Sequence, residues 1–280
     1  MTATDSTGPE MSRFTAVLLA GDRGPDDPVA EHAGTSCKAI VDIEGRPMIT
    51  RVLDALLRSD YVDTIIVCGP SAGALEECAE IQPYLERDDI QHMANLDSPS
   101  LSVESALSRV SRDKPVFLTT ADHALLETQL VDYFLEKSSL SGADVNVGLV
   151  NYKTIQDRFP QVKRTVLKFA DGGVCGCNLF SFNNETGRQI APFWRKVEQK
   201  RKQPWKLVLG LLGPLGVVKY VANKLSLDGA LQRISRGLQM QVNAVVLPFP
   251  QAGVDVDSVG DLEFVRGILG RKEQIQSVGK

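Results

Sequence analysis

Short apolar runs alternate with segments of helical spacing over the first 150 residues, and this alternation constrains the fold most strongly. We expect strands at 14–20, 63–68, 115–120 and 144–150, and helices at 47–59, 71–81, 102–110 and 127–136. The runs are apolar without polar alternation, which is typical of parallel strands buried on both faces. The order predicts an α/β fold, with right-handed crossovers and helices on both faces of a parallel sheet.

The second half of the chain has a less regular pattern. Two strand-like runs, 165–170 and 174–182, flank an Asp171-Gly172-Gly173 turn and predict a hairpin. We expect mostly helix over 185–238, a strand at 242–247, and a helix from Ser258 to Leu269 with Ser258 as its N-cap. The amino-acid composition does not shift anywhere along the chain in the way that marks a linker between domains. We therefore expect one domain over 13–272 with a helical insertion at about 185–238, a disordered tail at 1–12 and a tail at 273–280.

Charge and cysteine content exclude several classes of protein. The 280 residues carry a formal net charge of −4, so no global basic field favours nucleic acid as a partner. The polar start lacks the apolar core of a signal peptide, and no apolar run reaches membrane-spanning length. Five scattered cysteines favour a reducing, cytoplasmic location over a disulfide framework, and we interpret Cys175 and Cys177 as core residues.

A glycine-containing loop after the first strand predicts a phosphate site. Leu19 and Ala20 end that strand, and Gly21, Asp22, Arg23 and Gly24 begin the loop. Backbone N–H groups in such a loop can bind phosphate oxygens, and the two glycines permit close approach. Arg23 and the later Lys38 can neutralise phosphate charge, which suits a nucleoside triphosphate. An ordinary surface loop with a solvated lysine is the alternative interpretation.

The segments LLAGDRG and KAIVDIEGRPM carry a family resemblance. They resemble the nucleotidyltransferases of the nucleotide-sugar pyrophosphorylase superfamily, with the molybdenum-cofactor nucleotidyltransferase-like (NTP transferase) branch as the nearest kin. Gly21, Lys38 and the Gly45-Arg46-Pro47 segment match the family pattern in order. Asp22 departs from it, because the family has a second glycine there. The resemblance implies a Rossmann-like three-layer α/β/α fold with a mixed, mainly parallel sheet.

The same resemblance implies a divalent metal and its ligands. Asp122, in TTADHALL after a strand, matches the family's metal-binding aspartate. In GVDVDSVGDL, Asp257 best fits a second metal carboxylate, with Asp255 as the alternative. The expected ion is Mg²⁺ or Mn²⁺, and Ser102 matches a serine near the nucleotide. Capping roles remain the alternative for each residue, and His123 is expected to be a packing or loop histidine.

The implied activity is transfer of a nucleotidyl group, cytidylyl or guanylyl, from a nucleoside triphosphate to a phosphorylated acceptor, with release of pyrophosphate. Lys38, Arg23 and Asp122 would carry the catalysis. Arg164, Lys168 and Asn178 are weaker candidates for acceptor binding. A glycosyltransferase of related fold and a non-catalytic nucleotide-binding protein are the rival hypotheses. We expect the 185–238 insertion to be a packed subdomain or dimer interface, with membrane-surface contact as the less favoured role.

Overall fold

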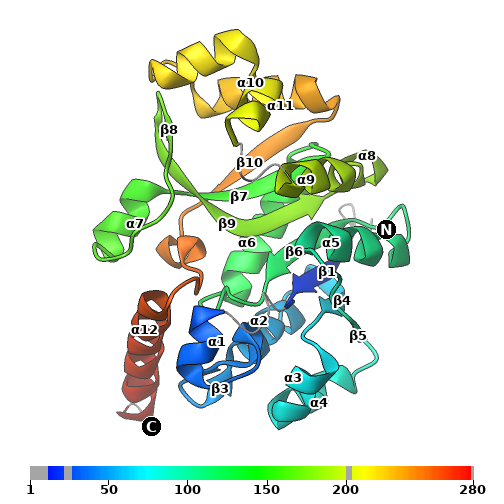
Figure 1. The fold of residues 1–280 in the computed structure, drawn as a ribbon, viewed down its shortest axis with the longest axis vertical. Helices are drawn as coiled ribbons and strands as arrows, with labels where there is room; N and C mark the ends of the chain where they lie inside the picture. The colour runs from blue at the N-terminus through cyan, green and yellow to red at the C-terminus, as the bar shows by residue number, and fades with distance from the viewer. Residues whose placement is uncertain (1–11, 22–26, 200–203, 279–280) are drawn as a thin grey trace, which may run out of the picture.

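An eight-stranded sheet runs through the computed structural model, which describes residues 12–21, 27–199 and 204–278 (Figure 1). The spatial order along the main path is β10-β7-β9-β6-β1-β4-β5, and β8 pairs with β9 at the side. The strands span Phe14–Leu19 (β1), Val62–Cys68 (β4), Ile90–Met93 (β5), Val116–Thr120 (β6), Val145–Asn151 (β7), Leu167–Phe169 (β8), Gly172–Phe182 (β9) and Val242–Leu247 (β10).

The sheet is mixed and mainly parallel, as the sequence predicts. β1 pairs in parallel with both β4 and β6, and β4 with β5, so their carboxyl ends meet at one edge. β9 runs antiparallel to β6, β7 and β8, while β7 and β10 pair in parallel. β2 (Asp42–Ile43) and β3 (Arg46–Pro47) form a separate two-stranded antiparallel ribbon. The loops at the shared carboxyl edge are where ligands of such sheets bind.

Helices cover both faces of the sheet and bury a separate apolar cluster on each (Figure 1). Alternation along β1 separates them, because Ala16 and Leu18 face one cluster and Val17 faces the other. The larger cluster includes residues of α1 (Pro28–Ala33), α2 (Met48–Leu57), α3 (Ala72–Glu77), α6 (Thr128–Leu140), α7 (Tyr152–Arg158) and α12 (Val259–Val278). The smaller includes residues of α5 (Pro99–Arg109) and α9 (Ile190–Gln199).

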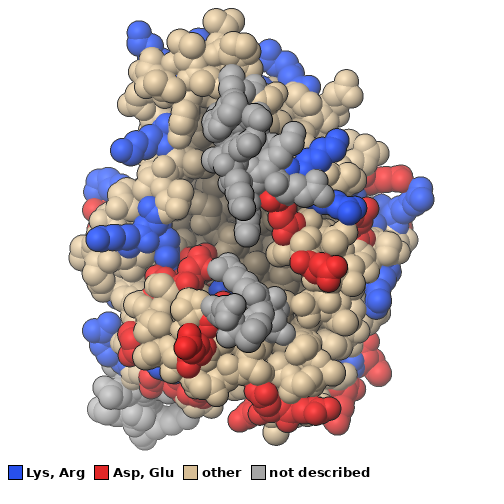
Figure 2. Space-filling view, viewed as in Figure 1, with Lys and Arg blue, Asp and Glu red and all other residues tan. Residues whose placement is uncertain are grey.

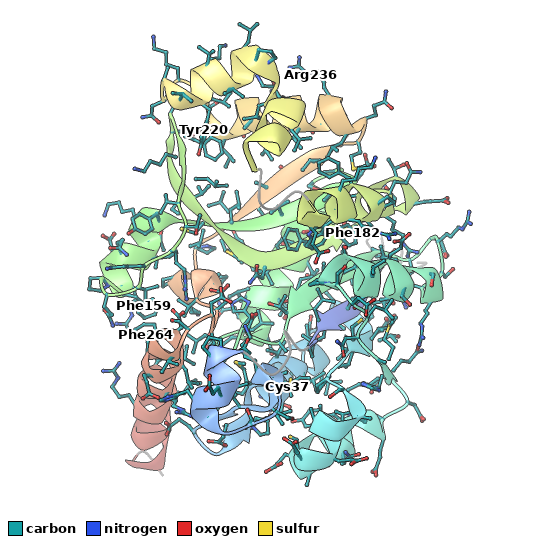
Figure 3. The ribbon with its side chains drawn as sticks, in the orientation of Figure 1. Cys37, Phe159, Phe182, Tyr220, Arg236 and Phe264 are labelled. Carbon is teal, nitrogen blue, oxygen red and sulfur yellow. The ribbon has the colours of Figure 1, made fainter. Side chains whose placement is uncertain are left out.

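The predicted insertion is helical, and it includes α8 (Glu185–Arg188), α9, α10 (Pro204–Val221) and α11 (Leu227–Leu238). A small cluster of Leu212, Leu225 and Ala230 joins α10 to α11. Phe169 of β8 packs edge-on against Tyr220 of α10 with ring centroids 5.8 Å apart, which ties α10 to the β8–β9 hairpin. Figure 3 labels Tyr220. The Ser100 hydroxyl donates to the Glu198 carboxylate, which links α9 to the start of α5.

The last helix, α12, is fixed by an aromatic contact and by an N-cap. Phe159, just after α7, packs edge-on against Phe264 of α12 with ring centroids 5.3 Å apart (Figure 3). Ser258 is the N-cap residue expected from sequence, since its hydroxyl accepts a hydrogen bond from the Asp261 N–H. These contacts fix the segment between β10 and α12, which carries Asp255 and Asp257.

Several helix boundaries differ from the sequence predictions. The helix expected at 71–81 is interrupted at Cys78, and Ala79–Ile81 forms a separate 3₁₀ turn before α4 (Gln82–Leu85). α5 begins at Pro99 and not at Ser102, because the Ser98 hydroxyl caps it. The loop expected between Gly21 and Lys38 contains α1, and β5 was not predicted.

Candidate active site

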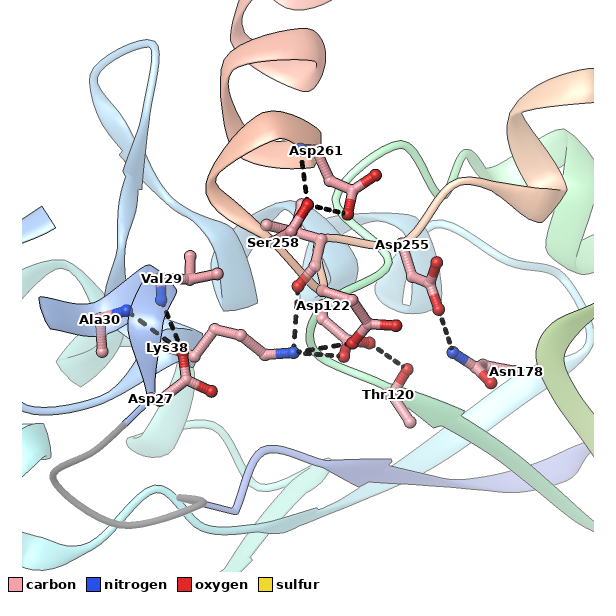
Figure 4. A network of polar contacts seen from close by, with 12 residues as sticks. Asp27, Val29, Ala30, Lys38, Thr120, Asp122, Asn178, Asp255, Ser258 and Asp261 are labelled. Carbon is pink, nitrogen blue, oxygen red and sulfur yellow. Dashed lines mark hydrogen bonds and ion pairs between the residues drawn. The ribbon is translucent and has the colours of Figure 1, made fainter. Parts of the chain in front are cut away.

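Lys38 lies where three segments distant in sequence meet (Figure 4). Its ammonium donates to Asp122 Oδ2 over 2.7 Å and to the Val256 carbonyl over 3.0 Å, and it lies 3.5 Å from Asp257 Oδ1. Lys38 opens a 3₁₀ turn, Lys38–Ile40, whose preceding residue Cys37 accepts the Ala39 N–H. The Lys38 side chain is 13% exposed.

Asp122 comes two residues after β6, at the carboxyl edge of the sheet. The Thr120 hydroxyl donates to its Oδ1 over 2.5 Å, and the carboxylate is 12% exposed. Burial alone would raise the pKa of Asp122, but the Lys38 ammonium and the Thr120 hydroxyl outweigh burial and hold it below its usual value. The carboxylate is therefore ionised and fixed in orientation.

The segment between β10 and α12 brings Asp257 to the same place. The Val256 N–H donates to the Asp122 carbonyl over 2.9 Å, which joins the two loops directly. Asp257 is 47% exposed, so its carboxylate is near Lys38 while remaining open to solvent. The predicted convergence of Lys38, Asp122 and Asp257 is thus present in the structure.

Asp255 faces a different set of groups. Its carboxylate accepts from Asn178 Nδ2 over 2.9 Å and lies 3.3 Å from Arg164 Nη2. Burial, with the nearby Asp257 charge, raises the pKa of Asp255 to about 6 despite Arg164. Residues 254–257 are not a strand, so alternation does not bring both carboxylates to one face. Asp255 points toward Asn178 in Figure 4, whereas Asp257 lies beside the Lys38 ammonium.

Arg164 and Asn178 both bond to the segment between β10 and α12. Arg164 donates to the Gly253 and Asp255 carbonyls, each over 2.7 Å, and its Nη1 lies 3.0 Å from Asp261 Oδ1. Arg164 is 12% exposed. It acts as a clamp on the loop that carries Asp257, a role that the sequence did not suggest.

Lys168 is exposed and lines a cavity of about 610 Å³ between the β8–β9 hairpin and α10. Tyr152, Phe169 and Tyr220 supply aromatic surface to the same cavity. Of the three residues proposed for the acceptor, Lys168 has a side chain open to a ligand-sized space.

The predicted phosphate loop begins at the carboxyl end of β1. Leu19 is half-buried, Ala20 is buried and Gly21 is exposed. A Cβ on Gly21 would lie 3.1 Å from the Asn95 side chain, and one on Gly69 would lie 2.9 Å from the Ala20 carbonyl. Loops after β1, β4 and β5 therefore converge closely here. Asp22, Arg23 and Gly24 lie outside the described residues.

Ser102 is buried within α5, and its hydroxyl accepts the Leu96 N–H over 2.9 Å. It therefore holds the β5–α5 loop in place, and a direct contact with nucleotide stays a prediction. Sequence reasoning missed Thr120, Asn95 and the Val256 carbonyl. Thr120 had a usable signal, since a hydroxyl two residues before Asp122 can donate to its carboxylate.

His123 and the cysteines match the structural roles expected of them. His123 is 1% exposed, and burial lowers its pKa to about 4, so the imidazole is neutral. All five cysteines are buried and reduced, including Cys175 and Cys177. Burial raises the pKa of Cys177 well above its usual value. None of these groups is presented as a nucleophile or metal ligand.

The two carboxylates beside Lys38 are oxygen ligands of the kind that a hard divalent cation prefers. Among the described residues, no three His, Cys, Asp or Glu side chains cluster closely enough to hold a metal alone. Mg²⁺, however, is commonly held by one or two carboxylates together with substrate phosphates and water. The Asp122 and Asp257 carboxylates, drawn together around one ammonium, satisfy that requirement once a polyphosphate supplies the remaining oxygens.

Comparison with known families agrees with this geometry. Residues 16–156, just over half of the chain, match the family described as the MobA-like NTP transferase domain. The chain belongs to the MobA-like NTP transferase family. It is a nucleotidyltransferase of the superfamily inferred from the LLAGDRG and KAIVDIEGRPM segments, and the matched range includes Lys38 and Asp122 but not Asp257. No curated protein matches the chain.

Solved structures show the same fold. A hypothetical transferase from Thermus thermophilus is 29% identical with a TM-score of 0.73, covering 89% of this chain and 99% of that one. A CMP:2-keto-3-deoxy-manno-octonic acid synthetase complexed with CTP is 13% identical (TM-score 0.56, 93% and 100% covered). A 4-diphosphocytidyl-2C-methyl-D-erythritol synthase from Anaerococcus prevotii is 14% identical (TM-score 0.53, 92% and 96% covered). The predicted nucleotide-diphospho-sugar transferase-like α/β fold is confirmed.

Proposed function

We propose that this NTP transferase transfers the nucleotidyl group of a nucleoside triphosphate to a phosphorylated small molecule in a metal-dependent reaction. An acceptor phosphate oxygen forms a bond to the α-phosphorus, the bond from that phosphorus to the bridging oxygen breaks, and pyrophosphate leaves. No covalent enzyme intermediate is required, so the protein aligns two anions and neutralises their charge. The observation that carries the proposal is the convergence of Lys38 with Asp122 and Asp257.

Each residue of the site has a separate role in the proposed reaction. Asp122 and Asp257 would hold Mg²⁺ or Mn²⁺, which supplies positive charge to the triphosphate when bound. Lys38, bonded to the same carboxylates, would turn its ammonium toward the phosphate oxygens. Thr120 keeps the Asp122 carboxylate oriented, and the neutral His123 contacts the Gln251 carbonyl through Nε2.

For the nucleotide donor we propose a class of molecule, and for the acceptor a location in the structure. Two structural neighbours are cytidylyl-transferring enzymes by name, and a cytidine or guanosine triphosphate is our proposed donor. The cavity beside Lys168 is the proposed location for part of the acceptor, since it combines a cation with aromatic surface. A cytoplasmic location, expected from cysteine usage, stays part of the proposal.

Thermal unfolding tests binding before the acceptor is known. Each of the four nucleoside triphosphates is added with and without Mg²⁺ to the wild type, Asp257→Asn and Asp88→Asn. Asp88 is an exposed aspartate just before β5, away from the carboxyl edge, and serves as the control. One triphosphate should raise the Tm of wild type and control in a Mg²⁺-dependent manner, and Asp257→Asn should lose most of this shift.

Turnover then separates the rival functions. The stabilising triphosphate is incubated with a panel of sugar phosphates and other small phosphorylated acceptors, and pyrophosphate is measured. Release that depends on one acceptor supports the proposal. Stabilisation by nucleotide-sugars alone would indicate a glycosyltransferase, and triphosphate binding without turnover on any acceptor would favour a non-catalytic binding protein.

A further inference from the structure

The outer side of α10 carries apolar side chains exposed to solvent. Leu215, Val218 and Val221 are 72%, 64% and 80% exposed. They recur every three residues after the kink at Gly213, so they lie on one side of the helix. They are three of the seven large apolar residues exposed in the described part of the chain, and we name them the α10 face.

The sequence that contains α10 is rich in cations. Residues 195–224 contain one acid, Glu198, against eight cations: Arg195, Lys196, Lys200, Arg201, Lys202, Lys206, Lys219 and Lys224. This segment therefore carries a net charge of +7 in a chain whose total is −4. Lys219 and Lys224 are exposed beside the α10 face, and no described carboxylate forms an ion pair with either. Glu198 is already bonded to Ser100.

The position of α10 in the molecule leaves this side accessible. α10 lies at the end of the molecule farthest from α12, and its inner side packs on α11 and the β8–β9 hairpin (Figure 1). In the view of Figure 2, the described side chains at this end include Lys and Arg but no Asp or Glu. Acidic side chains appear lower, around the hollow in the middle of that face.

We propose that the α10 face docks the protein onto the surface of an anionic phospholipid bilayer. Apolar side chains flanked by cations on one side of a helix are the combination that binds such surfaces. Lysine stems lie along the apolar surface while their ammonium groups reach lipid phosphates. In the described residues no helix is long and apolar enough to cross a membrane.

A second copy of this chain fits the α10 face less well. Stable protein dimers bury about 800 Å² on each partner, which is far more than three side chains provide. Two α10 faces brought together would also oppose the positive charges of Lys219 and Lys224, which lie beside each face. A bilayer supplies the complementary negative charge and needs no shaped partner surface.

Vesicle co-sedimentation tests the proposal with the full chain and does not require catalysis. The probes are vesicles of 30% phosphatidylglycerol in phosphatidylcholine and of phosphatidylcholine alone, each at low and high salt. The Leu215→Gln/Val218→Gln/Val221→Gln variant should bind anionic vesicles at least tenfold more weakly. Lys219→Gln/Lys224→Gln should weaken binding about 25-fold at low salt, since each surface cation contributes roughly fivefold.

The control is Leu140→Gln, which changes an apolar residue 68% exposed at the end of α6 and should leave binding unchanged. Circular dichroism verifies that each variant is folded, and the single Val221→Gln variant, at an 80% exposed position, replaces the triple variant if it unfolds. The proposal is overturned if the wild type does not sediment with anionic vesicles, or if the triple variant binds as the wild type does. It is also overturned if the α10 substitutions abolish a concentration-dependent dimer, because a second copy then covers this face.

Discussion

Lys38 occupies the position between Asp122 and Asp257 where a divalent ion would also be stabilised. A buried carboxylate requires a positive partner, and the ammonium supplies it in the protein alone. In the proposed reaction Asp122 and Asp257 would hold the divalent ion, and the Lys38 ammonium would then meet phosphate oxygens of the triphosphate. Lys38 thus keeps the Asp122 carboxylate ionised and lies close to both carboxylates, which is a structural reason for a lysine here.

Replacing Lys38 by methionine should destabilise the protein, because Asp122 is then buried without its counter-ion. Removing one partner of a buried pair costs about 3 kcal/mol. The double variant Lys38→Met/Asp122→Asn should regain part of that loss, since the unpaired charge is gone. Urea unfolding of both variants measures the difference. Equal stabilities would show that the ion pair contributes little.

His123 makes a specific contribution to pH-dependent stability. Burial lowers its pKa from 6.5 to about 4, so between these values the unfolded chain binds a proton that the folded chain does not. Stability from this residue is complete above pH 6.5 and declines by about 3 kcal/mol as the pH falls to 4. His123→Gln should lose stability less steeply over that range in urea titrations. Parallel curves for the two proteins would refute the assignment.

At the scale of elements, the connection from β10 to α12 decides whether Asp257 reaches Lys38. Arg164 holds this connection through two carbonyls and two carboxylates, and Val256 ties it to Asp122. The connection has no regular structure at 254–257, so its shape depends on these bonds. Arg164 therefore belongs to the site through the loop that it positions.

We predict that Arg164→Met raises the Mg²⁺ concentration needed for half-maximal nucleotide stabilisation by about tenfold. For Arg164→Lys this Mg²⁺ concentration should lie between those of the wild type and Arg164→Met. One ammonium can meet a carboxylate, but it cannot bond to both carbonyls and both carboxylates. The measurement is Tm against Mg²⁺ at fixed triphosphate. A loss of Tm without any change in the Mg²⁺ dependence would contradict the positioning role.

Two helical glycines form a matched pair for testing packing. A Cβ on Gly187 of α8 would lie 2.1 Å from the Asp144 carbonyl oxygen, whereas one on Gly73 of α3 meets nothing within 4 Å. Gly187→Ala should therefore destabilise by about 1–3 kcal/mol, because backbone atoms must shift. Gly73→Ala should be neutral or stabilise by up to about 1 kcal/mol. Thermal unfolding compares them, and similar Tm changes would be inconsistent with the α8 packing described.

Across the whole molecule, the predictable features are those set by topology. Parallel strands place their carboxyl ends at one edge, so the loops after β1 and β6 were expected together, and the family resemblance supplied Lys38, Asp122 and Asp257. The roles of Arg164 and Asp255 were not predictable. A cation near a strand edge looks the same in sequence whether it faces a ligand or two backbone carbonyls.

Local chain geometry explains the remaining differences. Alternation relates Asp255 to Asp257 only in a strand, and these residues lie in an irregular segment. Ser98-Pro99 was the true start signal of α5, three residues before the expected one, which placed Ser102 inside the helix. The sequence of 185–238 predicted helix correctly but not which side of α10 would remain exposed.

Crystals grown with Mn²⁺ and the stabilising triphosphate test the central claim most directly, because anomalous scattering locates the ion. The account predicts one Mn²⁺ ligated by Asp122 and Asp257 and by triphosphate oxygens, with the Lys38 ammonium moved onto a phosphate. An ion bound elsewhere, or a triphosphate lying away from these carboxylates while Lys38 keeps its 2.7 Å bond to Asp122, would contradict it.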